Sequence, residues 1–251
     1  MVYFVGAGPG AADLITVRGQ KLLQTADVII YAGSLVNPDH LQQAKNSCKI
    51  FNSASMTLEE VIREMKAAEA EGKITVRLHT GDPSIYGAVR EQMDLLDKEG
   101  IAYEAVPGVS SFCGAAAALK AEYTLPDVSQ TVIITRMAGR TPVPEKEEMS
   151  LLASHRATMA IFLSAGLLEG LQQQLLEGGY REDTPAAIVY KATWPDEKVL
   201  TGTVGELAEI GQKNKITKTA LVLVGDFLGN TYERSRLYDP SFSHEFREAS
   251  K

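Results

Sequence analysis

The stretch Val2-Tyr-Phe-Val-Gly-Ala-Gly-Pro-Gly10 decides the fold class of this chain. It joins a run of β-branched and aromatic residues over Val2–Val5, typical of a buried strand, to a glycine-rich turn. A helix is expected from about Asp13 to Gln24, and Val28–Tyr31 has the composition of a second strand. Strand, turn, helix and strand in this order predict an α/β fold with a parallel sheet.

Strands and helices continue to alternate toward the middle of the chain. The clearest helix begins at Thr57, which forms a capping-box pattern with Glu60, and Gly72 is well placed to end it. The other elements predicted in this half are the strands Ile74–Leu78 and Tyr103–Val106 and the helices Tyr86–Glu99 and Ser110–Leu119.

The pattern lapses between Lys120 and Gln130, so we predict two α/β domains, residues 1–120 and residues 121–251. The strands predicted in the second domain are Thr131–Thr135, Thr158–Phe162, Ala186–Tyr190, Lys198–Gly202 and Ala220–Val224. Its predicted helices lie near Glu145–Ser154, Leu167–Leu176 and Val204–Ile210. Hairpin-like connections stand beside crossover connections here, which predicts a mixed sheet.

The composition excludes several classes of protein. Of the 251 residues, 45% are hydrophobic and 23% are charged, which is ordinary for a globular protein. The formal net charge of −7 argues against a nucleic-acid partner, and two cysteines and four histidines at no ligand spacing argue against a metal site. The chain has no basic leader and no apolar run of the ~20 residues that span a bilayer. We therefore expect a cytoplasmic protein without a membrane partner.

The turn Gly6-Ala-Gly-Pro-Gly10 is also compatible with a dinucleotide-dependent oxidoreductase. That function needs an acidic residue at the carboxyl end of the second strand to hold a ribose. Asp27 has about the right spacing but precedes Val28–Tyr31, and Pro9 lacks an N–H group that could face a pyrophosphate. Both observations count against this alternative.

Two further strand ends carry loops of unusual chemistry. Thr80-Gly-Asp-Pro-Ser-Ile-Tyr-Gly87 and Pro107-Gly-Val-Ser-Ser111 each follow a predicted strand. Asp82 could pair with an ammonium group or accept a ribose hydroxyl, and Ser110 and Ser111 could cap a helix or contact a ligand. Each loop alone is an ordinary turn. Together, at consecutive strand ends of a parallel sheet, they predict a cofactor pocket.

The motifs in this order resemble the tetrapyrrole methyltransferases, the class III enzymes that depend on S-adenosylmethionine. The similarity extends to about residue 228. The segments that carry it are Val5-Gly-Ala-Gly-Pro-Gly10, Asp13-Leu-Ile-Thr16, Ala26-Asp-Val-Ile-Ile-Tyr31, Leu78-His-Thr-Gly-Asp-Pro83, Val106-Pro-Gly-Val-Ser-Ser111 and Thr219-Ala-Leu-Val-Leu-Val-Gly225.

Within this family, Tyr31-Ala-Gly-Ser-Leu-Val-Asn37 is similar to the branch that methylates C11 of precorrin-4 or cobalt-precorrin-4 in cobalamin biosynthesis. Thr80 replaces a glycine of the sirohaem branch, and Ala88-Val-Arg90 replaces its Arg-Gly-Gly, which argues against uroporphyrinogen as substrate. Methylation of another corrin carbon remains an alternative. The resemblance implies two α/β domains with the cofactor between them, a small-molecule tetrapyrrole substrate and a homodimer.

The resemblance also implies the residues of the site. The cofactor contacts that it implies are Pro9, Thr80, Gly81, Asp82, Ile85, Ser110, Ser111, Leu163, Ala187 and Ala220. Because the implied substrate is a polycarboxylate, arginines are expected to bind it. The candidates are Arg18, Arg90, Arg136 and Arg140. No residue is assigned as a general base, because an electron-rich tetrapyrrole carbon is itself the nucleophile and binding geometry can supply much of the catalysis.

Overall fold

The computed structural model describes residues 1–250 and separates the chain into two compact units. The first unit comprises residues 1–115 together with the segment 191–197. The second comprises residues 116–190 and the chain from Lys198 onward. Nothing in the sequence pattern indicated that residues 191–197 would join the first unit.

The sheet of the first unit is entirely parallel, as predicted, with the strand order β3-β2-β4-β1-β5. Its strands are β1 (Val2–Gly6), β2 (Val28–Tyr31), β3 (Lys49–Asn52), β4 (Thr75–His79) and β5 (Tyr103–Val106). Strand β3 was not predicted: it is a four-residue edge strand whose side chains are mostly exposed, so it carries no hydrophobic alternation. Because the strands are parallel, the loops that follow β1, β4 and β5 leave the same edge of the sheet.

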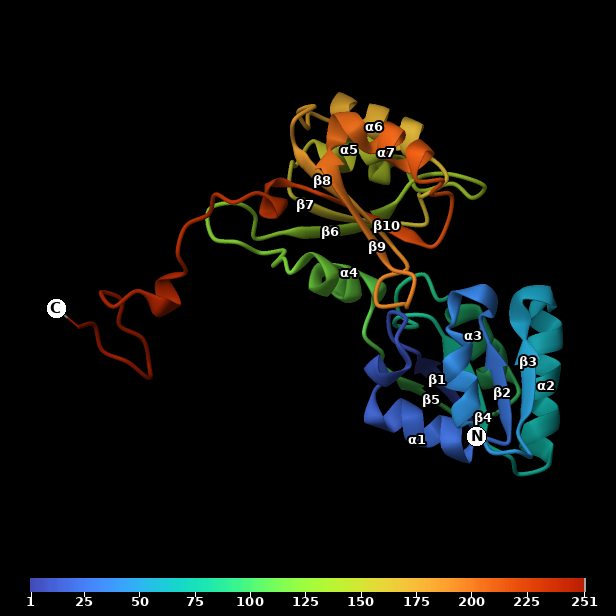
Figure 1. The fold of residues 1–251 in the computed structure, drawn as a ribbon. Coiled ribbons are helices and arrows are strands. Elements are labelled where there is room, and N and C mark those ends of the chain that lie inside the picture. The colour runs from blue at the N-terminus through green and yellow to red at the C-terminus, as the bar shows by residue number, and fades with distance from the viewer. Residues whose placement is uncertain (251) are drawn as a thin grey trace. The chain divides into compact units, whose positions relative to one another are not determined.

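Helices cover both faces of this sheet (Figure 1). These helices are α1 (Val17–Thr25), α2 (Leu58–Ala70) and α3 (Arg90–Lys98), whereas α4 (Ser111–Leu119) follows β5 and continues past Ala115 into the second unit. Leu23 of α1 packs with Val5 and Leu78 on one face, whereas Ile62 of α2 and Leu96 of α3 pack on the other. The predicted capping box of α2 is present, with the Thr57 Oγ1 accepting from the Glu60 N–H at 3.3 Å.

Two predicted helices begin later than expected. The stretch predicted from Asp13 is a short 3-10 turn, and α1 begins only at Val17, after its N-cap Thr16. The helix predicted from Tyr86 begins at Arg90. Tyr86 and Ala88 have φ angles of 55° and 49°, which an α-helix cannot contain, so they form the end of a loop instead.

The second unit has the mixed sheet that the sequence predicted, with the order β6-β7-β10-β8-β9. Its strands are β6 (Val132–Arg136), β7 (Thr158–Phe162), β8 (Pro185–Tyr190), β9 (Lys198–Thr203) and β10 (Ala220–Val224). Among the strand pairs of this sheet within residues 1–250, only β6–β7 is parallel, and the other pairs are antiparallel. Helices α5 (Met149–Ala153), α6 (Leu168–Glu177) and α7 (Leu207–Lys213) lie on one side of it (Figure 1).

The predicted helices of the second unit are partly 3-10 in character. The helix predicted over Glu145–Ser154 is a 3-10 turn followed by the short α5, and the one predicted from Val204 becomes α-helical only at Leu207. The 3-10 helices of the chain are Ala12–Leu14, Gly33–Leu35, Pro38–Gln43, Ser53–Ser55, Glu145–Glu147, Val204–Glu206, Asp226–Leu228 and Arg236–Tyr238. No helix within residues 1–250 has both the length and the apolar character needed to cross a membrane.

Candidate functional site

The loops after β1, β4 and β5 meet through the backbones of four glycines. Gly8 and Gly81 exchange two backbone hydrogen bonds, of 3.2 and 2.8 Å. A Cβ added to Gly108 would lie 2.2 Å from the Gly81 carbonyl oxygen, and one added to Gly6 would lie 2.6 Å from the Gly108 Cα. Neither distance is compatible with a side chain, so the close approach of the loops requires glycine at both positions.

Asp82 ties two of these loops together. Its Oδ2 accepts from the Gly108 N–H at 2.8 Å, and its Oδ1 accepts from the N–H and the hydroxyl of Ser84 at 2.9 and 2.5 Å. Partial burial raises the pKa of the Asp82 carboxyl, but these hydrogen bonds outweigh it and hold the pKa below its usual range. The carboxylate therefore fixes the β4 loop against the β5 loop, a contribution that the sequence did not predict.

The first turn of α4 closes the same edge of the sheet. The position that a Cβ of Gly81 would occupy is 3.3 Å from the Ser111 backbone nitrogen, and Ser110 is only 8% exposed. On the same helix, a Cβ at Gly114 would meet the Pro9 ring at 2.6 Å. The structure thus brings together the first-unit residues of the predicted cofactor site, namely Pro9, Thr80, Gly81, Asp82, Ile85, Ser110 and Ser111.

The segment 191–197 contacts the end of the glycine-rich loop. A Cβ at Gly10 would lie 2.1 Å from the Trp194 Cδ1, and the Ala11 N–H donates to the Thr193 Oγ1 at 2.9 Å. The amide of Asn37, which is buried, donates to the Gly10 carbonyl at 3.0 Å. Sequence reasoning missed these contacts, although Trp194 is the only tryptophan of the chain and Asn37 ends the Tyr31–Asn37 motif.

The three site residues predicted in the second unit are not presented on one surface. Ala187 lies opposite Leu223 in the β8–β10 ladder, whereas Ala220 lies opposite Tyr190. Because side chains alternate along a strand, Ala187 and Ala220 point to opposite faces of the sheet. Leu163 follows β7, has a φ of 53° and is 64% exposed. The antiparallel pairing of β7 with β10 places it at the sheet end where Ala220 begins β10.

The candidate arginines differ in how their guanidinium groups are used. Arg18 pairs with Glu104 at 3.1 Å, and Arg90 pairs with Asp94 at 2.6 Å. Arg136 donates to three backbone carbonyls between residues 137 and 142, which holds that turn together. Arg140 is exposed and has no side-chain hydrogen bond or ion pair within residues 1–250. It is therefore the candidate whose charge is available for a ligand.

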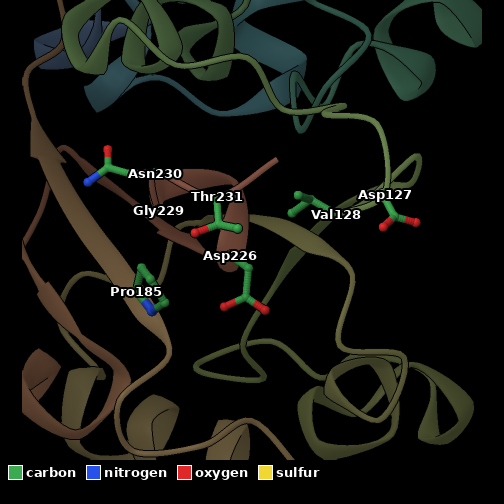
Figure 2. A pocket seen from close by; sticks show the side chains of 7 residues that line it. All are labelled: Asp127, Val128, Pro185, Asp226, Gly229, Asn230 and Thr231. Carbon is green, nitrogen blue, oxygen red and sulfur yellow. The ribbon is translucent and has the colours of Figure 1, made fainter. Parts of the chain in front are cut away.

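The second unit also contains a pocket of about 320 Å³, shown in Figure 2. None of the predicted site residues lines it. Its lining is Asp127, Val128, Pro185, Asp226, Gly229, Asn230 and Thr231. Two carboxylates without a basic side chain among the lining residues would repel a polycarboxylate, so this pocket does not fit the implied substrate.

The structure weakens the dinucleotide alternative. Asp27 precedes β2, where it pairs with Lys45 at 2.6 Å and accepts from the Ile74 N–H at 2.9 Å. It therefore lies at the amino end of the strand, away from the glycine-rich turn at the carboxyl end of β1, and it cannot hold a ribose bound there. Within residues 1–250, no group of three or more histidine, cysteine or acidic side chains could hold a metal ion.

Comparisons with known proteins agree with the geometry. The family model of the Tetrapyrrole (Corrin/Porphyrin) Methylases matches residues 1–208. The chain is 55% identical over 251 residues to the cobalt-precorrin-4 C(11)-methyltransferase of Methanocaldococcus jannaschii, with 100% of this chain and 97% of that protein covered.

Two solved structures show the same fold. The cobalamin biosynthetic enzyme cobalt precorrin-4 methyltransferase, CbiF, matches with a TM-score of 0.89 and 50% identity, over 91% of this chain and 96% of that chain. Uroporphyrin-III C-methyltransferase from Thermus thermophilus, in complex with S-adenosyl homocysteine, matches with a TM-score of 0.77 and 26% identity, over 90% and 98%. The sequence motifs, the two sheets and these matches together show that the chain belongs to the tetrapyrrole methylase family.

Proposed function

We propose that this protein transfers a methyl group from S-adenosylmethionine to C11 of cobalt-precorrin-4 or precorrin-4, a step of cobalamin biosynthesis. The observation that carries the proposal is the edge of the first sheet where Gly6, Gly81 and Gly108 bring three loops into backbone contact. The 55% identical relative, which is named for this reaction, supports the choice of substrate.

The loops fit the donor because they present backbone and small polar groups rather than bulky side chains. S-adenosylmethionine carries an adenine with ring-nitrogen acceptors and an amino donor, ribose hydroxyls and an amino-acid end, all of which bind to backbone N–H and C=O groups and to hydroxyls. Thr80, Ser110 and Ser111 supply hydroxyls beside Gly81, where a side chain at the glycine would fill the space. The NAD alternative is not supported, because no acidic residue that could hold the ribose stands at the carboxyl end of β2, which ends Val28-Ile-Ile-Tyr31.

The chemistry needs little from the protein beyond geometry. When bound, the sulfonium donor supplies an activated methyl group. The chain's own contribution is to hold donor and acceptor in line, which can lower a barrier by several kcal/mol without a covalent intermediate. The tie between Asp82 and Gly108 and the Gly8–Gly81 bridge give the loops the rigidity that this requires.

Recognition of the substrate is assigned to basic side chains, Arg140 first. An available guanidinium can form two parallel hydrogen bonds to a carboxylate, and the acetate and propionate groups of a corrin precursor offer several. Arg18, Arg90 and Arg136 have protein partners already, so each would have to exchange a partner to bind substrate. We also propose a homodimer and a cytoplasmic location, on the basis of the family resemblance.

The test is an assay of methyl transfer with a labelled donor. The purified protein is incubated with ¹³C-methyl S-adenosylmethionine and, in separate reactions, with cobalt-precorrin-4 and precorrin-4. A product carrying one label, located at C11 by nuclear magnetic resonance, is expected from at least one substrate. A label at another corrin carbon, or no transfer from a donor that binds, would contradict the assignment. The ratio of the two rates identifies the preferred metal state.

A further inference from the structure

A buried arginine lies beneath the loop that follows β4. Arg77 is 7% exposed, and its Nε–H donates to the Gln92 Oε1 at 3.0 Å while its Nη1 donates to the Ile30 carbonyl at 3.1 Å. No carboxylate pairs with it within residues 1–250. Burying an unpaired cation is costly, and an apolar residue would fill this core position at lower cost. The arrangement therefore calls for a reason other than stability.

Gln92 connects this arginine to the loop. Gln92 is 5% exposed on α3, and its Nε2 donates to the Ala88 carbonyl at 2.9 Å. The Arg77 Nε–H can only donate, so it requires the Gln92 carbonyl oxygen on its side. That requirement turns the amide nitrogen of Gln92 toward Ala88. The arginine thus selects the orientation in which Gln92 can hold the loop.

The end of the loop that is held in this way has an unfavourable backbone conformation. Tyr86 and Ala88 have positive φ angles, and a Cβ at Gly87 would lie 2.1 Å from the Pro83 carbonyl oxygen. Non-glycine residues persist in this conformation only where surrounding contacts enforce it. The Ala88 carbonyl, bound by a buried amide, is such a contact.

We propose that Arg77 and Gln92 are positioning residues, which fix the loop 80–89 in the conformation that binds the methyl donor. The inference rests on the proposed function, because it takes the loop to be a binding site for the methyl donor. Neither side chain is proposed to contact the donor or the tetrapyrrole. Their effect is on the fraction of molecules whose loop is ready to bind.

The decisive variant is Gln92→Glu. A carboxylate still accepts from Arg77, so the buried pair is kept, but it cannot donate to the Ala88 carbonyl. We expect the dissociation constant of S-adenosylhomocysteine, measured by calorimetry, to rise about tenfold, with the KM for S-adenosylmethionine rising in parallel and kcat at saturation staying within twofold. The matched control is Gln172→Glu in the second unit, where the side chain only accepts, from the Ala208 N–H. We expect this control variant to bind S-adenosylhomocysteine as tightly as the wild type.

A second pair of variants covers the case in which Gln92→Glu does not fold. Arg77→Lys keeps a donor for Gln92, whereas Arg77→Met removes it, so we expect the lysine variant to recover much of the affinity that the methionine variant loses. A folded Gln92→Glu that binds like the wild type, or equal affinities for the two Arg77 variants, would overturn the inference. Failure of the wild type itself to bind S-adenosylhomocysteine would instead refute the proposed function.

Discussion

The two units each contain a five-stranded sheet, but they bury different kinds of polar side chain. The buried polar residues of the first unit include two histidines, an arginine, an asparagine and a glutamine. Those of the second unit, among the residues described, are Thr135, Thr158, Ser164 and Thr184. Burying a hydroxyl costs little free energy, because one backbone partner satisfies it. Burying an ionisable group costs much more. The costly groups therefore lie in the unit that carries the glycine-locked loops.

The buried ionisable groups indicate that the first unit gives up stability to position its loops. His40 is 1% exposed, and among residues 1–250 neither of its ring nitrogens nor the Nε2 of the buried His79 has a hydrogen-bond partner. His79 directly precedes the Thr80–Gly87 loop, and Arg77 lies two residues earlier on β4. The second unit instead has an apolar core between its sheet and α5, α6 and α7.

The largest effect is expected from a single methyl group at the loop junction. In Gly108→Ala the new Cβ would lie 2.2 Å from the Gly81 carbonyl oxygen, and backbone cannot move aside as a flexible side chain can. We expect a loss of about 3 kcal/mol in the free energy of unfolding, the upper end for overpacking, together with loss of S-adenosylhomocysteine binding.

The matched control for that variant is Gly170→Ala in the second unit. Gly170 lies within α6, and its Cβ would meet the Met137 Cε at an ordinary 3.8 Å, so stability should be unchanged or rise by about 0.5–1 kcal/mol. Denaturant unfolding measures both variants. Equal free energies of unfolding for the two variants would show that the close backbone contact at Gly108 does not exclude a side chain.

Acid should destabilise the protein through the buried histidines of the first unit. Burial, helped by the Arg77 charge, lowers the pKa of His79 to about 3, and burial also lowers the pKa of His40. Between the folded pKa of His79 and its unfolded pKa of about 6.5, only the unfolded chain takes up the proton, so stability is complete above pH ~6.5 and falls as the pH decreases.

The expected contribution of His79 between pH 6.5 and pH 5 is about 2 kcal/mol, from ~1.4 kcal/mol per pH unit. The variant His79→Gln should flatten the pH dependence of the free energy of unfolding by that amount, which denaturant titrations at pH 5, 6 and 7 would measure. A wild-type stability that does not change over this range would show that His79 is not held neutral in the core.

Much of the fold could be predicted from the sequence, because hydrophobic runs bounded by turn residues mark strands directly. The strands β2, β5, β7 and β10 have the bounds that were predicted, and the parallel and mixed sheets follow from the connections. The late start of α3 could not be predicted, because it depends on the left-handed conformations of Tyr86 and Ala88, which local sequence does not favour.

The site was predictable only where it is built from consecutive residues. The glycine-rich loops could be located from the sequence, because glycine and proline mark turns wherever they occur. The contact of Trp194 with Gly10 and the Arg77–Gln92–Ala88 chain join residues that are distant in sequence or hidden inside regular elements. No local pattern encodes such pairings. The role of Asp82 as a tie between loops was missed for the same reason, since its partner Gly108 is 26 residues away.

A smaller effect is expected from Asp82→Asn. One side-chain oxygen becomes an N–H₂ group, so either the Gly108 N–H or the Ser84 donors lose their acceptor. Loss of one hydrogen bond of ordinary strength costs about 1–1.4 kcal/mol, which corresponds to a five- to tenfold weaker binding of S-adenosylhomocysteine if the loop tie sets affinity. The control is Asp183→Asn, which removes an exposed pair with Arg181 in the second unit. Unchanged affinity in Asp82→Asn would make Asp82 an ordinary turn residue.

The smallest effect is expected from Arg140→Ala. Exposed charge pairs contribute less than about 1 kcal/mol, so we expect the KM for the tetrapyrrole to rise about threefold while the affinity for S-adenosylhomocysteine stays the same. Arg136→Ala should also weaken substrate binding, but with a loss of stability, because Arg136 holds the 137–142 turn. Unchanged substrate KM in both variants would exclude these arginines from the substrate site.

Thermal unfolding with added ligand tests whether the loops locked by Gly6, Gly81 and Gly108 bind a methyl donor. A ligand at about 100 times its dissociation constant stabilises by roughly 2.7 kcal/mol, which for a protein of this size raises Tm by about 5–11 °C. We expect this rise with S-adenosylhomocysteine, its loss in Gly108→Ala, and no rise with NADP. A rise with NADP alone would contradict binding of a methyl donor and would assign the Gly6–Gly10 loop to a dinucleotide.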